Sequence, residues 1–256
     1  MSWASRRRTI YTGSVLLFFG VVVGGPLAYW YLSTPATCTD GVQNHGETAP
    51  DRGGPCPLVD PRTLQPEAIL WTRAFKVRDG SYSAVAYVQN ANEKVGIAAV
   101  RYHFSLYDSQ NILIAERDGV TYLMPSAVTP VFAAGIDTGN RIVAHTYFEF
   151  TSPLIWERLQ NTATVLSVDN KAVSDVSTTP RISADATNSS IADAIDPRFV
   201  AVVFDTAGNA IAASQTALPR IAAGESGKIA FTWPHPFSAA VGRVDIIPLM
   251  PPAQAE

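Results

Sequence analysis

The feature that most constrains this chain is an uncharged, apolar run of 23 residues near its N-terminus, from position 10 to position 32. About 20 apolar residues are enough for a helix to cross the hydrocarbon core of a bilayer. Three arginines at positions 6–8 precede the run, and the next basic residue is Arg52. Because flanking basic residues stay on the cytoplasmic side, we predict a cytoplasmic stub at 1–9, a transmembrane helix at 10–32 and an extracytoplasmic remainder at 33–256.

A cleaved signal peptide is the alternative interpretation of this run. The apolar core of a signal peptide is about 7–15 residues long and ends at a small-x-small site. This run is longer, and only Thr34-Pro35-Ala36 offers a weak cleavage site. Aromatic residues at both ends, Tyr11 and residues 29–31, are typical of interfacial belts. The sequence favours an uncleaved anchor, and we expect a kink near Pro26.

The composition excludes several classes of protein. Only 16% of the 256 residues are charged and the net charge is −3, whereas about 25% are charged in typical soluble domains. The chain is therefore neither a charged disordered tail protein nor a nucleic-acid binder built on a basic surface. The charge is also uneven: the first 32 residues hold three of the 19 basic groups and no acid, so residues 33–256 carry 16 basic and 22 acidic groups, a net −6.

The segment at 38–56 is bounded by the only two cysteines of the sequence and is rich in glycine and proline. It contains almost nothing apolar, so burial cannot stabilise it. Disulfides persist outside the cytoplasm, and a Cys38–Cys56 bond would contribute about 3 kcal/mol by restricting the unfolded chain. Four prolines between 55 and 66 predict a stiff, extended spacer. We therefore assign 33–66 to a cysteine-bounded loop followed by a proline-rich spacer.

Four oxygen-bearing side chains of this loop form a candidate calcium site: Asp40, Asn44, Glu47 and Asp51. Calcium prefers hard oxygen ligands of this kind. The spacing does not match an EF-hand, and the alternative is that these side chains form turns by accepting hydrogen bonds from nearby backbone. Apart from calcium at this loop, the sequence indicates no cofactor.

Beyond residue 66, apolar residues recur with a period close to two, between turn signals about 8–12 residues apart. That pattern is typical of β-sandwiches. Three pairs of segments recur in the two halves: 106–108 with 203–205, 90–92 with 188–190, and 150–156 with 231–237. The repeats predict a β-sandwich domain at 67–160 and a second, degenerate copy at 161–256.

Alternation along the first repeat predicts that Phe104, Leu106 and Tyr102 point into the core. Asp108 and Asp205 then close the following turns by accepting hydrogen bonds from backbone amides. The predicted fold class is mainly β: an N-terminal transmembrane helix followed by two tandem immunoglobulin-like β-sandwich domains.

Residues 104–108 spell Phe-Ser-Leu-Tyr-Asp, and the first domain resembles the FxLYD family of small extracytoplasmic β-sandwich domains in bacterial and archaeal surface proteins. Residues 38–56 are similar to a recurrent extracellular bacterial motif, C-x-D-G-x-x-N-x-x-E-T-x-x-D-C-G-G-x-C, and Arg52 stands where that motif has its second cysteine. With the anchor, the chain resembles membrane-anchored surface proteins of Parcubacteria-type candidate-phylum bacteria. The resemblance implies a fold and no catalytic residues.

No catalytic motif stands out in the sequence, and the four histidines show no metal-ligand spacing. Trp71 and Trp233 have no counterpart in the other repeat, which makes them candidates for an exposed binding surface. We predict a single-pass membrane-anchored protein, not an enzyme, that binds or scaffolds envelope proteins or surface glycans and no nucleic acid. The alternative is an envelope enzyme or enzyme subunit, for example glycan-acting, with a site at the domain seam.

Overall fold

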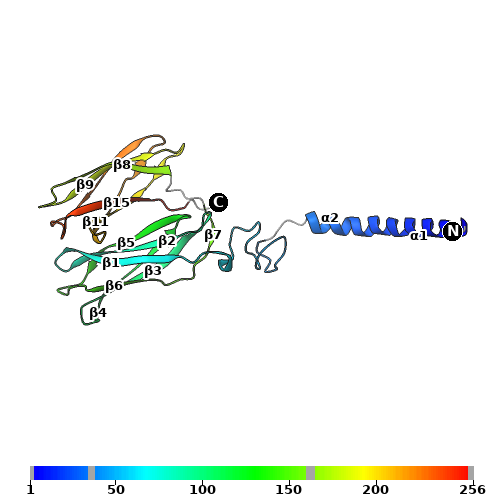
Figure 1. Ribbon diagram of the computed structural model, residues 1–256, viewed down its shortest axis with the longest axis horizontal. Helices are drawn as coiled ribbons and strands as arrows, with labels where there is room; N and C mark the ends of the chain where they lie inside the picture. Colours follow the sequence, from blue (N-terminus) through cyan, green and yellow to red (C-terminus); the bar gives the residue numbers. More distant parts are fainter. Residues whose placement is uncertain (1–2, 34–37, 160–164, 253–256) are drawn as a thin grey trace. The chain divides into compact units, whose positions relative to one another are not determined.

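The computed structural model describes residues 3–33, 38–159 and 165–252. It divides into two compact units, Met1–Pro57 and Leu58–Glu256. The first unit contains the N-terminal helix and the cysteine-bounded loop, and the second contains the β-strands (Figure 1). The predicted fold class, mainly β with one N-terminal apolar helix, is confirmed.

The N-terminal helix runs from α1 (Trp3–Phe19) through a π-helical turn (Gly20–Gly24) into α2 (Gly25–Ser33). Pro26 has no backbone N–H, so the carbonyl of Val22 loses its usual helical partner. A wider π-helical turn directly before a proline absorbs such a defect. The kink expected near Pro26 stays a prediction. Residues Arg6–Trp30 are long and apolar enough to cross a membrane, although a signal sequence near an N-terminus has the same properties.

The first pair of sheets in the second unit is module 1, residues 68–158. One of its sheets has the order β1 (Ala68–Arg78), β2 (Ser81–Asn90), β5 (Ala127–Asp137). The other is built from β3 (Val95–Tyr107), β4 (Leu113–Leu123), β6 (His145–Phe150) and the short β7 (Glu157–Arg158). Neighbouring strands are antiparallel.

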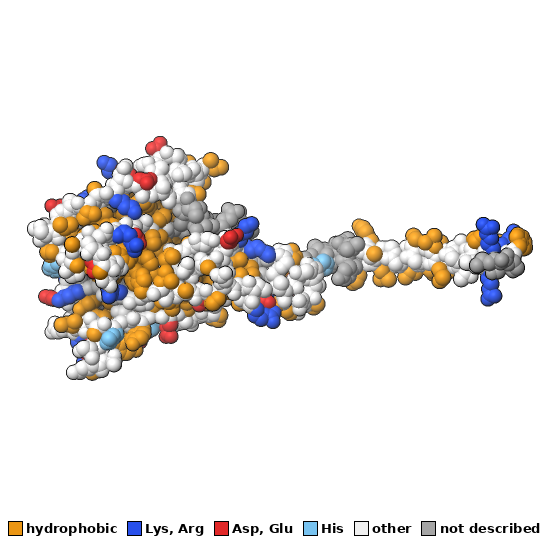
Figure 2. Space-filling model, in the orientation of Figure 1, with side chains coloured by type: hydrophobic (Ala, Val, Ile, Leu, Met, Phe, Trp, Pro, Cys, Tyr) orange, Lys and Arg blue, Asp and Glu red, His pale blue; other side chains and the backbone are white. Residues whose placement is uncertain are grey.

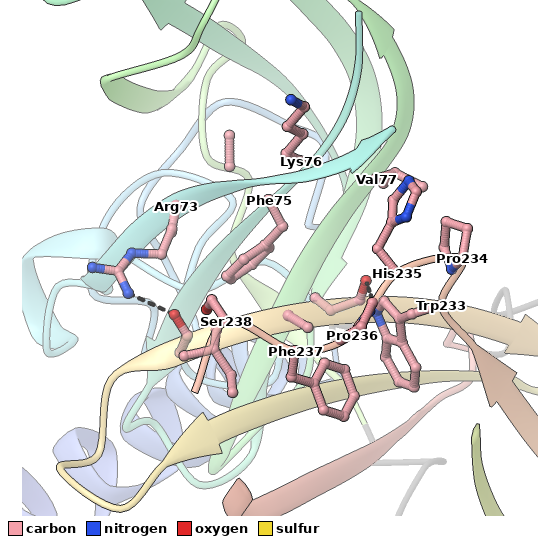
Figure 3. A pocket seen from close by; sticks show the side chains of 15 residues that line it. Arg73, Phe75, Lys76, Val77, Trp233, Pro234, His235, Pro236, Phe237 and Ser238 are labelled. Carbon is pink, nitrogen blue, oxygen red and sulfur yellow. Dashed lines mark hydrogen bonds between the residues drawn. The ribbon is translucent and has the colours of Figure 1, made fainter. Parts of the chain in front are cut away.

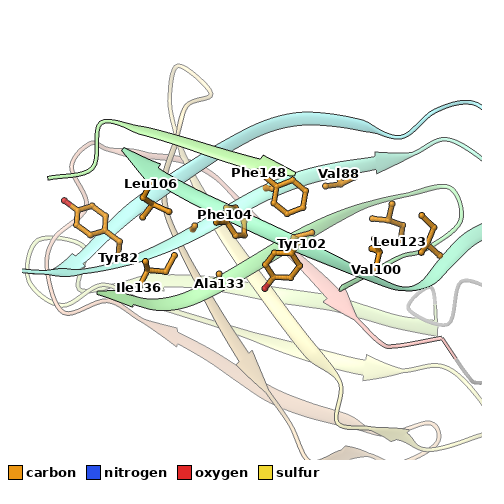
Figure 4. Close-up of a cluster of buried hydrophobic side chains, with 14 of the residues drawn as sticks. Tyr82, Val88, Val100, Tyr102, Phe104, Leu106, Leu123, Ala133, Ile136 and Phe148 are labelled. Carbon is orange, nitrogen blue, oxygen red and sulfur yellow. The ribbon is translucent and has the colours of Figure 1, made fainter. Parts of the chain in front are cut away.

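The core of module 1 lies between these two sheets (Figure 4). Phe104 and Leu106 of β3 are completely buried, and Tyr102 is almost so, as the sequence predicted. On the opposite sheet, the even-numbered residues of β2 from Tyr82 to Val88 face the same core. The alternation of side chains along β3 therefore accounts for the F-x-L part of the motif.

The prediction of an extended spacer at 55–66 is wrong for the second half of that segment. Val59 is buried in the core of module 1, and its backbone N–H donates to the Trp156 carbonyl at 2.8 Å. Further along, Gln65 exchanges two hydrogen bonds with the Asn92 side chain. Apolar residues between the prolines gain more from burial against the sheets than from solvent exposure, so this segment packs onto module 1.

The second pair of sheets is module 2, residues 166–249. One sheet has the order β14 (Ser226–Thr232), β9 (Arg181–Asn188), β8 (Leu166–Ser174). The other has the order β12 (Ala210–Ala217), β11 (Arg198–Asp205), β15 (Val241–Leu249), and β10 (Ala194–Ile195) pairs with β13 (Arg220–Ile221). The predicted domain boundary at 160/161 lies outside the described residues.

Two of the three sequence repeats correspond in the structure. Asp108 Oδ1 accepts hydrogen bonds from the amides two and four positions later, and Asp205 Oδ1 does the same. Asn90 and Asn188 are both buried at the end of a strand, and each donates from Nδ2 to backbone carbonyls of neighbouring segments. These equivalences align β3 with β11 and β2 with β9.

The prediction that 150–156 and 231–237 are equivalent segments of the two copies is wrong. Phe150 lies on β6, which pairs with β3, whereas Phe231 lies on β14, which pairs with β9. Since β3 corresponds to β11 and not to β9, these two segments lie in sheets that are not equivalent in the two modules. Their likeness reflects a strand that ends just before a proline, which cannot donate to a β-ladder.

The two modules pack sheet against sheet, so that four sheets form successive layers (Figure 1). The β1–β2–β5 sheet of module 1 faces the β12–β11–β15 sheet of module 2 through a third apolar cluster. As a result, the central strands β2 and β11 are buried on both faces. We call this interface the seam.

Repeat-equivalent residues differ according to whether they face the seam. On β11, the outward positions 200, 202 and 204 are Val, Val and Phe, while the equivalent positions of β3 are His103, Ser105 and Tyr107. On β2, the outward Val85 and Tyr87 correspond to Ser183 and Asp185 of β9. The apolar member of each pair is at the seam and the polar member lies on an outer sheet. The seam therefore depends on apolar residues at outward positions that are polar in the other copy.

This comparison predicts the effect of giving β11 the residue of the other copy. Val202→Ser removes two methyl groups and buries a hydroxyl at a fully buried position, and we expect it to lower the free energy of unfolding by about 2 kcal/mol. Urea unfolding of the full chain in detergent measures this change. The reverse substitution on the outer sheet, Ser105→Val, is the matched control, with an expected change within about 0.5 kcal/mol. Equal effects of the two substitutions would contradict the assignment of the seam.

Candidate functional site

The Cys38–Cys56 disulfide is present, as predicted. Beside it, Glu47 is buried, and its Oε2 accepts hydrogen bonds from the backbone amides of Asn44 and Asp51. Glu47 Oε1 lies 3.1 Å from Cys56 Sγ; this is a contact only, because a disulfide sulfur has no hydrogen to donate. The cluster Cys38, Glu47, Cys56 is compact enough to suggest a metal site, but both of its sulfurs are used in the disulfide.

The other proposed calcium ligands also hold the loop together. Asp40 accepts from the Val42 amide and the Asn44 side chain, and Asp51 accepts from the Gly41 amide with both carboxylate oxygens. These contacts are those expected of turn formers. The geometry therefore favours the alternative reading of Asp40, Asn44, Glu47 and Asp51 as acceptors for the loop's own backbone, and calcium binding stays a prediction.

The seam contains an aromatic surface made by both modules. Trp71 of β1 stacks on Tyr87 of β2, with ring centroids 4.3 Å apart, and Phe204 of β11 meets the Trp71 ring edge-on at 6.2 Å. Two adjoining cavities of about 260 and 590 Å³ share Trp71, Phe204 and Gly208 in their walls. We call the two cavities together the seam cleft. The volume of the larger cavity falls within the range of about 300–1,000 Å³ that is typical of small-molecule sites.

Charged side chains surround this aromatic surface. The Arg243 guanidinium lies over the Phe204 ring, 4.2 Å from its centroid, and its Nε donates to Asp245 Oδ1 at 3.0 Å. Lys171 of β8 donates to the Val244 carbonyl, and Arg73 of β1 donates to the Ala210 carbonyl. Figure 2 shows hydrophobic side chains gathered along the seam with Lys and Arg side chains beside them.

The Tyr87 hydroxyl is unusual among the described residues. Tyr87 is 6% exposed and lines the larger cavity, yet its hydroxyl has no hydrogen-bond partner. Burial raises the pKa of this hydroxyl, and the negative charge of Asp245 raises it further. The group is therefore a protonated donor at neutral pH. A buried donor without an acceptor costs about 1–3 kcal/mol, so it calls for an explanation.

A third cavity of about 340 Å³ lies on the other side of Arg73, between β1, β12 and the segment Trp233–Ser238 (Figure 3). Trp233 keeps only 8% of its surface exposed, and its Nε1–H donates to the Ala213 carbonyl. Its ring belongs to the core of module 2, so the prediction that Trp233 lies on an exposed patch is wrong. Large apolar rings are usually buried unless a partner covers them.

Trp71, in contrast to Trp233, remains partly exposed and lines the seam cleft. The sequence did not indicate its companions Tyr87, Phe204 and Arg243. For Tyr87 the sequence did contain a signal, because the short apolar run at 82–88 does not alternate with charged residues. All of these residues are buried in the structure. Such a run is typical of a strand covered on both faces.

The outer sheet of module 1 carries a second charged group of residues. His103 Nδ1 lies 2.8 Å from Asp118 Oδ1 and its Nε2 lies 3.1 Å from Glu116 Oε1; both contacts are hydrogen bonds only when the ring is protonated. Glu149 is opposite His103 on β6. The hydrogen bond to Asp118 is the main cause that raises the pKa of His103 above its ordinary value, against a smaller opposing effect of burial.

The raised pKa predicts a pH-dependent stability. The contribution of His103 is fully present below the unfolded-state pKa of about 6.5 and is lost as pH rises through the higher folded-state value. We therefore expect the free energy of unfolding of the wild type to fall from pH 6 to pH 8 relative to His103→Gln, measured by urea unfolding. His145→Gln, at an exposed position on β6, is the control and should follow the wild type. A His103→Gln profile parallel to the wild type would contradict the ion-pair assignment.

No family model and no curated protein sequence matches the chain. Solved structures with local similarity include a β-glucuronidase of Bacteroides uniformis, at 12% identity over 61% of this chain and a TM-score of 0.20. A β-glucuronidase from glycoside hydrolase family 2 is 11% identical over 67% of this chain, with a TM-score of 0.24. Red sea bream transglutaminase is 12% identical over 73% of this chain, also with a TM-score of 0.24. The chain covers 22–30% of the length of these structures. Likeness at these TM-scores carries no argument about function.

Proposed function

We propose that the chain is a single-pass membrane-anchored protein whose extracytoplasmic part binds a ligand of the cell envelope at the seam cleft, without catalysis. The observation that carries this proposal is the cleft itself: the partly exposed Trp71 ring of module 1 packs against the buried rings of Tyr87 and of Phe204 from module 2, and charged side chains surround it. Exposed apolar surface rimmed by polar residues usually marks a site of interaction.

The N-terminal segment of the chain supports the location. An apolar helix follows the three arginines of positions 6–8, which favours a cytoplasmic N-terminus. The disulfide in the following loop belongs in an oxidising compartment. Both observations agree with an anchor whose C-terminal remainder is extracytoplasmic. We propose that the two modules are immunoglobulin-like, FxLYD-like domains held at the envelope.

The alternative, a glycan-acting enzyme with its site at the seam, would need suitable catalytic groups there. Glycoside hydrolysis usually employs two carboxyl groups about 5–10 Å apart. Of the described residues that line the seam cleft, Asp245 is the one with a carboxylate, and it is engaged by Arg243. This lining favours binding over hydrolysis.

Removal of the central ring tests the binding proposal. We expect Trp71→Ala to lose at least tenfold in affinity for envelope material, because an aromatic anchor in a binding site contributes about 2 kcal/mol or more. The measurement is retention of envelope polysaccharide and protein fractions on full-length protein in nanodiscs. Tyr147→Ala, which removes a ring 60% exposed on the outer sheet of module 1, is the matched control and should bind as the wild type. Consumption of a glycan in place of stable retention would decide for the enzyme.

The anchor is tested by the mass of the mature protein. If the apolar helix stays in the membrane, the purified protein has the full 27.5 kDa of the chain. Intact-mass spectrometry of protein extracted from membranes measures this directly. A mass lower by the first ~35 residues, the length typical of a signal peptide, would show that the segment is cleaved.

A further inference from the structure

We infer that the ligand of the seam cleft is an acidic polysaccharide, one whose sugar units carry carboxylate or phosphate groups. The inference rests on the proposed binding function and adds the chemical class of the ligand. Three features of the cleft support it: the arrangement of its rings, the sign of its charge, and the Tyr87 hydroxyl.

The rings suit a sugar. The C–H face of a pyranose packs on an aromatic ring and leaves the hydroxyl groups pointing outward to polar neighbours. Trp71 and Phe204 are shared by both adjoining cavities, so the rings lie where the two cavities meet. Of the two rings Trp71 is the partly exposed one, so a polymer can pass over Trp71 with successive units in the two cavities.

The charge of the lining is opposite to that of the surrounding protein. Arg73, Lys171 and Arg243 line the cleft against a single acid, Asp245, a formal net of +2. Residues 33–256 as a whole carry −6. A local positive site on an acidic chain attracts an anionic ligand. The planar guanidinium groups of the two arginines also match the geometry of carboxylate and phosphate oxygens.

The Tyr87 hydroxyl gives a third reason. It is a buried, protonated donor without a partner among the described residues, next to the larger cavity. Asn209 lines the smaller cavity, and its side chain is held in place by Asp205. Sugars carry closely spaced hydroxyl and ring oxygens that accept from such groups, and a ligand oxygen near Tyr87 would remove the cost of the unpaired donor.

The test uses full-length protein in nanodiscs and isothermal titration calorimetry at low ionic strength. The probes are oligogalacturonate with its neutral methyl ester, phosphorylated dextran with unmodified dextran, and oligoglutamate of equal charge. We expect at least one acidic glycan to bind about tenfold more tightly than its neutral counterpart, with an advantage that shrinks as salt is added. Whichever acidic glycan binds distinguishes carboxylate from phosphate as the recognised group.

Variants separate the role of charge from loss of structure. Lys171→Gln should weaken binding of the acidic glycan and leave the neutral one unchanged, and Lys228→Gln, an equal change of charge at an exposed position on β14, should have no effect. Asp245→Asn removes the one carboxylate of the cleft and should tighten binding of the acidic glycan. A gain of affinity cannot result from partial unfolding.

Each contrary result has a distinct meaning. Equal, Trp71-dependent binding of acidic and neutral glycans would overturn the inference about charge and leave the proposed binding function standing. Oligoglutamate that binds as tightly as the acidic glycans, and competes with them, would show that the ligand is an acidic peptide. If no probe binds while envelope material is still retained through Trp71, the ligand class is wrong; if neither occurs, the proposed function fails as well.

Discussion

The second unit of this protein depends on burial of both faces of two central strands, β2 and β11. Each strand contributes one face to the core of its own module and the other face to the seam. In an isolated module the seam-facing side chains, such as Val85 or Val202, would be exposed to water. The free-energy cost of this exposure is proportional to their apolar area. The seam therefore fixes the two modules together. It also brings Trp71 and Tyr87 next to Phe204 and Arg243, which no single module could do.

The two modules meet through sheets that are not equivalent. Module 1 uses the sheet of β2, whereas module 2 uses the sheet of β11, whose counterpart in module 1 is the outer sheet of β3. Such a head-to-tail arrangement could continue indefinitely if every outward face were apolar. The outer faces instead carry His103 and Ser105 at one end and Ser183 and Asp185 at the other. Polar side chains at these positions do not favour the stacking of a further module, as is the case for capping repeats in solenoids.

Much of the local architecture was predictable from the sequence, because it depends on short-range rules. Alternation placed Phe104 and Leu106 in the core, the turn after Asp108 follows from side-chain bonds to nearby amides, and two cysteines in an oxidising context pair with each other. Errors arose where the sequence pattern was ambiguous. The Phe-Thr-x-Pro likeness of 150–153 and 231–234 marks how strands end and not which sheet they join, and the prolines of 55–66 concealed a segment that packs on module 1.

The sequence by itself determined an apolar N-terminal helix, a disulfide-closed loop, a β-rich remainder and an internal repeat, since the periodicity, composition and spacing of residues along the chain encode each of these. Only the tertiary structure decided which outward faces meet. The local sequence does not show that the second face of β11, with Val200, Val202 and Phe204, packs against module 1. Trp71 and Trp233 are equally prominent in the sequence, but of the two only Trp71 lines the seam cleft. A site assembled from two modules depends on contacts between residues more than 100 positions apart, and local pattern does not specify contacts at that distance.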